Sequence, residues 1–224
     1  MTRMLDKIIG PRVDLDEWRQ HRARYAAPGV AMMLSRILLI VSLFLPYWHM
    51  ELKAPQYPDG LQLTAYINYL TGDVAEIDGL NHYIGMRPLG DAAKFEKIVG
   101  VWALISLVLL IEGAMYIHSR WALLLAIPAL TFPFFFLADL WFWMNHFGQN
   151  LDPTAPLSSA IKPFTPPILG TGDIGQFQTV AGMGWGLILA FISAGILLIG
   201  MFLHRQAYKP LLKASDDAKA VQRD

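Results

Sequence analysis

The chain has 224 residues, of which 54% are hydrophobic and 16% charged, with a formal net charge of zero and a mean hydropathy of +0.38. This is fewer charged residues than soluble domains carry, which indicates an integral membrane protein, and the zero net charge argues against a nucleic-acid partner. The absence of cysteine excludes disulfides, thiolate zinc sites, iron–sulfur clusters and covalently attached haem.

Residues 1–29 form a charged tail, in which Asp14–Tyr25 is either a short interfacial helix anchored by Trp18 or a partly ordered segment. Four apolar runs follow, each long enough to cross a hydrocarbon core of about 30 Å. They span residues 30–48, 98–117, 121–143 and 181–203 within a membrane domain of residues 30–203, before a tail of residues 204–224. We therefore predict an all-α protein, a bundle of four transmembrane helices. The glycines of the fourth run favour close approach of a neighbouring helix.

Basic residues predict the orientation, because cytoplasmic loops of membrane proteins are enriched in lysine and arginine. With both termini inside, twelve of the eighteen basic residues are cytoplasmic and five are outside, while Arg36 lies within the first span. We expect a multi-pass protein of the bacterial inner membrane, in contact with membrane lipid. Residues 49–97 and 144–180 are then two ordered periplasmic loops, rich in proline and glycine, that pack on each other.

Two ionisable residues fall within the predicted spans. Arg36 and Glu112 are at similar depth on antiparallel helices, so they could form a buried ion pair that fixes helix register, or part of a proton relay. Near the outer end of the third span, Asp139, Trp143 and His146 recur at helical spacing on one face.

Imidazole and thioether side chains gather in the segments predicted to be outside. The candidate metal ligands are His49, Met50, His82, Met86 and His146, and Met144 is near His146. This combination suits copper, particularly the reduced ion, and His82 and Met86 would share a face if that turn is helical. Asp139, Trp143 and Asp152 are candidates for outer positions around the metal or for structural roles. The alternative is that these side chains only pack or form hydrogen bonds.

Two other functions remain open, and no motif for nucleotide binding or hydrolysis favours an enzyme. The prolines and aromatic residues of the two loops could form a rigid docking surface for a periplasmic or membrane protein partner, making the chain a structural subunit of a larger complex. Alternatively, a b-type haem could be held by His118 with His204, or by His49 with His146.

Four sequence segments resemble those of a known group of proteins. They are KAPQYPDGLQL, GDVAEIDGLNHYIGM, DLWFWMNHFGQNLDPTAPL and PFTPPILGTGDIGQF. Together they resemble small four-helix bacterial membrane proteins associated with nitrous oxide reductase maturation and copper delivery, and the resemblance covers roughly residues 40–180. It implies an accessory role related to copper and assigns no catalytic residue. Because this chain has no appended chaperone domain, the resemblance implies that a copper carrier would be a separate protein.

Overall fold

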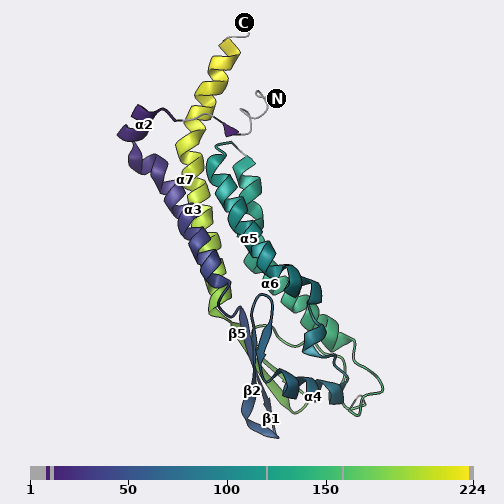
Figure 1. The fold of residues 1–224 in the computed structure, drawn as a ribbon. Coiled ribbons are helices and arrows are strands. Elements are labelled where there is room, and N and C mark those ends of the chain that lie inside the picture. The colour runs from purple at the N-terminus through teal and green to yellow at the C-terminus, as the bar shows by residue number, and fades with distance from the viewer. Residues whose placement is uncertain (1–8, 11–12, 120, 158, 222–224) are drawn as a thin grey trace. The chain divides into compact units, whose positions relative to one another are not determined.

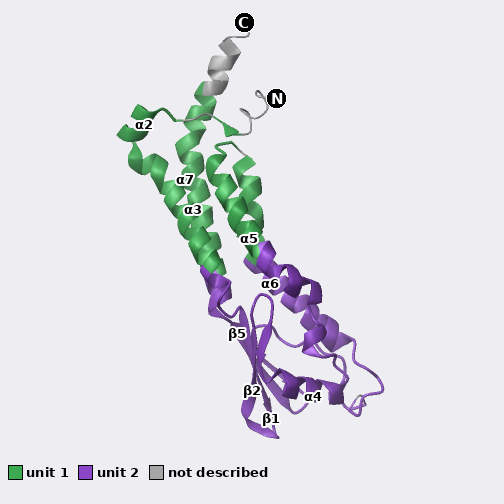
Figure 2. Ribbon diagram, viewed as in Figure 1, with its two compact units in different colours: residues 1–40, 104–132, 190–224 green, residues 41–103, 133–189 purple. Residues whose placement is uncertain are grey.

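The computed structural model describes residues 9–10, 13–119, 121–157 and 159–221, with side chains as far as residue 214. Residues 1–8 and 11–12 of the N-terminal tail, Arg120, Ser158 and the last three residues lie outside the described part. Figure 2 shows two compact units. The helical unit comprises residues 1–40, 104–132 and 190–224, and the sheet unit comprises residues 41–103 and 133–189.

Four long helices are present, namely α3 (Arg22–Ser42), α5 (Lys94–Tyr116), α6 (Trp121–Gln149) and α7 (Trp185–Val221) (Figure 1). Each contains a stretch long and apolar enough to cross a membrane, which in α7 lies within Trp185–Ala214. The four predicted spans therefore correspond to four candidate membrane helices. Their limits differ from the predicted ones, because α3 ends at Ser42 and the apolar residues that follow lead into a buried strand. An apolar run alone does not separate a helix from a buried strand.

The N-terminal tail contains a short helix, α2 (Leu15–Gln20), where the sequence left open a helix or a partly ordered segment over residues 14–25. Asp14 caps it, since its Oδ1 accepts a hydrogen bond from the Leu15 backbone N–H at 2.9 Å. His21 interrupts the helix before α3 begins at Arg22. The predicted segment is thus divided between two helices.

Small side chains let α3 and α7 approach each other in the helical unit. The Ser35 and Ser193 hydroxyl oxygens lie 2.9 Å apart, and the Ser193 hydroxyl also donates to the Ser35 carbonyl at 2.8 Å. At Gly200 a Cβ would stand 3.2 Å from the Cβ of Ala31, so this glycine permits the contact that the sequence predicted for the fourth helix.

The all-α prediction is wrong, because the two predicted loops form a five-stranded antiparallel sheet of order β3-β2-β1-β5-β4. The first loop contributes β1 (Trp48–Ala54), β2 (Tyr57–Ala65), β3 (Leu70–Gly72), the helix α4 (Val74–Ile84) and a 3₁₀ turn, η1 (Leu89–Asp91). The second contributes β4 (Gly170–Ile174) and β5 (Phe177–Met183). Strands β1 and β5 pair from Trp48↔Met183 to Lys53↔Gln178, so residues 181–183 belong to a strand and not to the fourth span.

The physical reason for the sheet is a two-residue alternation of apolar side chains in β1 and β2. In β1, Trp48, Met50, Leu52 and Ala54 are buried, and the residues between them are more exposed. One face of the sheet therefore becomes a core, which α4 and the end of α6 complete with Ile77, Ile84, Met144 and Phe147. Antiparallel sheets commonly bury one face in this way.

Candidate functional site

Strand β1 separates two of the predicted metal ligands. Neighbouring side chains of a strand point to opposite faces of a sheet. Met50 is 5% exposed and lies in the core, whereas His49 is exposed on the other face, beside Gly182 of β5. The two residues therefore do not contribute to the same site.

The C-terminal end of α4 brings Asn81 and Met86 to the core. Gly85 has a left-handed backbone (φ 81°), its N–H donates to the His82 carbonyl, and the Met86 N–H donates to the Asn81 carbonyl at 2.8 Å. This is a Schellman motif, which ends a helix at glycine and turns the chain back toward it. His82 is exposed, while Asn81 and Met86 are 7% and 8% exposed, so His82 and Met86 do not share a face.

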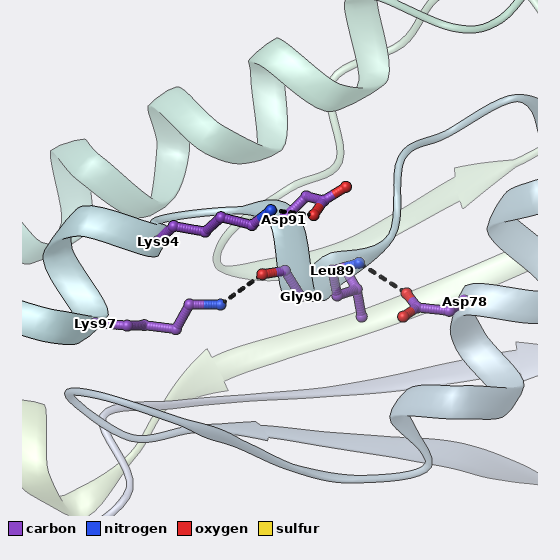
Figure 3. Close-up of polar contacts among 6 residues, drawn as sticks. All are labelled: Asp78, Leu89, Gly90, Asp91, Lys94 and Lys97. Atoms are coloured by element: carbon purple, nitrogen blue, oxygen red, sulfur yellow. Dashed lines mark hydrogen bonds and ion pairs between the residues drawn. The ribbon is translucent and has the colours of Figure 1, made fainter.

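Polar contacts hold the segment that follows Met86 (Figure 3). Asp78 of α4 accepts a hydrogen bond from the Leu89 N–H at 2.7 Å, and the Lys97 ammonium donates to the Gly90 carbonyl at 2.9 Å. Lys94 and Asp91 form an ion pair at 2.6 Å, and the hydrogen bond from Lys94 lowers the pKa of the Asp91 carboxyl. The turn that carries Met86 and Leu89 is therefore fixed to both α4 and α5.

Met144, which lies near the end of α6 and is 8% exposed, completes a group of three methionines. Met50, Met86 and Met144 line one cavity of about 40 Å³ between the sheet, α4 and α6. Apart from Asn81 and Thr179, every side chain lining this cavity is apolar. A single water needs about 10–15 Å³ by this measure, so the cavity admits a few atoms and no large cofactor. We call it the methionine cavity.

The sequence placed Met144 near His146 but did not include it among the candidate ligands. The structure places the His146 ring parallel to that of Phe142, with ring centroids 5.9 Å apart, and its Nδ1 3.3 Å from the amide nitrogen of Asn150. His146 does not line the methionine cavity. The packing of α6 against the sheet brings Met144 to the same cavity as Met50 and Met86.

The other candidates also lie apart from the cavity. Trp143 packs against the sheet core, and Asp139 lies one turn before it on α6. Asp152 is exposed and accepts hydrogen bonds from the Thr154 hydroxyl and N–H, which lower the pKa of its carboxyl. Within the described part of the chain, no three His, Asp or Glu side chains come together as a metal site. The metal-binding side chains that line one cavity together are those of the three methionines.

The helical unit contains the two remaining sets of predicted residues. Arg36 and Glu112 form an ion pair between α3 and α5. His118 Nδ1 and His204 Nε2 lie 3.1 Å apart, with the Tyr208 ring stacked 3.8 Å from His118. Metal–imidazole bonds are about 2 Å long, so two axial histidines of a haem hold their nitrogens about 4 Å apart. The direct contact between His118 and His204 leaves no room for a haem iron in this arrangement.

Comparison with protein-family models and with curated protein sequences finds no match for this chain.

Proposed function

We propose that this chain is a non-enzymatic membrane accessory protein whose sheet unit binds copper(I) and hands it to a separate carrier. One observation carries the proposal: Met50, Met86 and Met144 come from a strand, a helix cap and a membrane helix, and all line the methionine cavity. Three methionines that are far apart in the sequence thus line the same small cavity.

The chemistry of the lining favours a soft cation. Thioether sulfur is a neutral, polarisable donor that suits copper(I), while calcium and magnesium require oxygen ligands. No carboxylate or imidazole lines the methionine cavity. The volume of about 40 Å³ suits one ion with a small companion.

We also propose where in the cell the sheet unit lies. The four candidate membrane helices support a membrane protein, and the distribution of basic residues favours an inner membrane with the sheet unit on the periplasmic side. Copper would then be bound outside the cytoplasm. The outer position can be tested by labelling a single cysteine introduced at the exposed residue Lys53, because the chain has no other thiol.

The direct test is a titration of the full chain, purified in detergent, with copper(I) against a coloured competing chelator in the absence of oxygen. Met50→Leu, Met86→Leu and Met144→Leu each remove one sulfur while nearly conserving volume, and such swaps usually cost less than about 1.5 kcal/mol of stability. Each is expected to weaken copper(I) binding by about tenfold or more, a loss of at least about 1.4 kcal/mol.

Met32→Leu is the matched control, because Met32 is fully buried in the helical unit. It should leave copper(I) affinity unchanged, as should His82→Ala at an exposed position outside the cavity. The proposal fails if the wild-type chain binds no copper(I). It also fails if the three cavity variants bind as tightly as the Met32 variant.

A further inference from the structure

One polar group in the methionine cavity has no hydrogen-bond partner among the residues that the structure describes. Asn81 is 7% exposed, and its side-chain Nδ2 is buried without a hydrogen-bond partner. An unsatisfied buried donor carries a free-energy cost, and such groups in folded proteins call for an explanation. The other polar side chain of the lining, Thr179, already donates its hydroxyl hydrogen to the Gly172 carbonyl at 3.2 Å. The amide of Asn81 is therefore the free side-chain donor of this cavity.

The cavity also lacks a charged group that could neutralise a bound cation. None of its lining side chains is ionisable. A lone monovalent cation in such surroundings is unfavourable, because three neutral thioethers supply no compensating charge. A negatively charged companion would make the bound unit neutral, and it would accept the hydrogen bond that Asn81 can donate.

Size limits the companion to a few atoms. A cavity of about 40 Å³ holds roughly three water-sized groups, which is enough for a copper ion and one halide-sized anion. A soft ion with three sulfur ligands has one tetrahedral position left, and a halide can fill it.

We infer that the methionine cavity takes copper(I) together with one halide-sized anion, bound to the metal and hydrogen-bonded by the Asn81 amide. This inference rests on the proposed binding of copper(I) by the three methionines. Asn81 is then a positioning residue for the anion. Copper stays in the +1 state throughout: on release the anion dissociates into solvent, and lone pairs of the receiving protein form bonds to copper as the three copper–sulfur bonds break.

The test compares the full chain in two salts of equal ionic strength, bromide and sulfate, with free copper(I) fixed by the same chelator. X-ray absorption at the copper edge reports whether a bromide neighbours the metal. The wild-type chain is expected to show sulfur and bromide neighbours, and to bind copper(I) about tenfold more tightly in bromide, as expected for one hydrogen bond to a charged acceptor.

Two substitutions at Asn81 make the test specific. Asn81→Leu removes the donor and should lose the bromide neighbour and most of the preference for bromide. Asn81→Asp supplies the negative charge itself, so it should bind copper(I) in sulfate about as tightly as the wild type does in bromide. Asn68→Asp places the same charge at an exposed position outside the cavity and should behave as the wild type.

The inference is overturned if the wild-type chain binds copper(I) equally in both salts with no bromide neighbour. Retention of the bromide neighbour by the Asn81→Leu variant would overturn it as well. Both results leave the proposed function standing, provided that the methionine variants still lose copper(I). Absence of copper(I) binding in either salt refutes the proposed function and this inference together, and the wild-type comparison does not depend on how well a variant folds.

Discussion

The glycine that ends α4 is expected to be essential for the methionine cavity, and Gly85→Ala tests this. Gly85 has φ +81°, and a Cβ there would lie 2.6 Å from the Asp152 carbonyl oxygen and 2.8 Å from the Asp152 nitrogen. The same glycine accepts a hydrogen bond from the Asp152 N–H on its carbonyl at 2.8 Å. An alanine must therefore adopt a strained backbone and push this segment away.

The two effects can be estimated separately. A left-handed backbone costs an alanine about 1–2 kcal/mol relative to glycine. Displacing the Asp152 segment to relieve contacts shorter than 3 Å also weakens one backbone hydrogen bond, worth about 1 kcal/mol. Gly85→Ala should therefore lower the free energy of unfolding by about 2–3 kcal/mol. Because the Schellman motif directs Met86 into the core, copper(I) affinity should fall as well.

A matched control lies in the same helix. Gly79 is within α4, and a Cβ added there meets no atom within 4 Å. Since alanine favours a helix interior over glycine by about 1 kcal/mol, Gly79→Ala should slightly stabilise the chain. Unfolding of both variants in detergent, followed by near-ultraviolet circular dichroism of the tryptophans, measures the difference. Equal stability of the two variants would refute the reasoning.

Three further results are expected, each from one contact. Glu112→Gln should destabilise the chain by about 3 kcal/mol, because it leaves the Arg36 charge in the span without its partner. The double variant Arg36→Met with Glu112→Met should recover most of that loss in the same melt, and no recovery would count against the ion pair. Burial lowers the pKa of His118, so the unfolded chain takes up the proton first, and stability should fall as pH drops below about 6.5. His118→Asn should flatten that slope in melts across this range, and an unchanged slope would exclude His118 as its source. Burial raises the pKa of Tyr47 to about 12, so its absorbance should change only near that pH, and Tyr47→Phe should remove this last step. Ionisation near the ordinary tyrosine value of about 10 would contradict the buried environment.

The four long apolar helices could be predicted because a long apolar run is a local property that hydropathy measures directly. The sheet was missed because its strands are short and surrounded by the proline and glycine that mark turns. The alternation of Trp48, Met50 and Leu52 was present in the sequence, but Trp48 was assigned to the end of the first span, and Met50 and Leu52 were assigned to the loop that follows it. Pairing of β1 with β5 is a contact between distant segments, which no local pattern specifies.

The candidate site could be predicted in part. Met50 and Met86 were among the predicted ligands, and both line the methionine cavity. His82 was chosen with Met86 on the assumption of a continuous helix, but Gly85 ends that helix and turns Met86 inward. Gly85 in LNHYIGM was the available signal, since glycine commonly ends a helix in this conformation. The sequence alone could not show that Met144 lines a cavity with Met50 and Met86, or that the Asn81 amide is unpartnered, because both depend on tertiary packing.

The position of β1 between β2 and β5 has a consequence for how the protein is made. Its first hairpin, β1 with β2, is synthesised early, but the partner for its other edge, β5, comes only after α5, α6 and β4. Until then, β1 presents an unpaired edge with a partly formed apolar face, a state prone to incorrect pairing with other chains. Synthesis of α5, α6 and β4 must therefore be complete before the sheet can close, and a chaperone that covers β1 during this interval should raise the yield of folded protein.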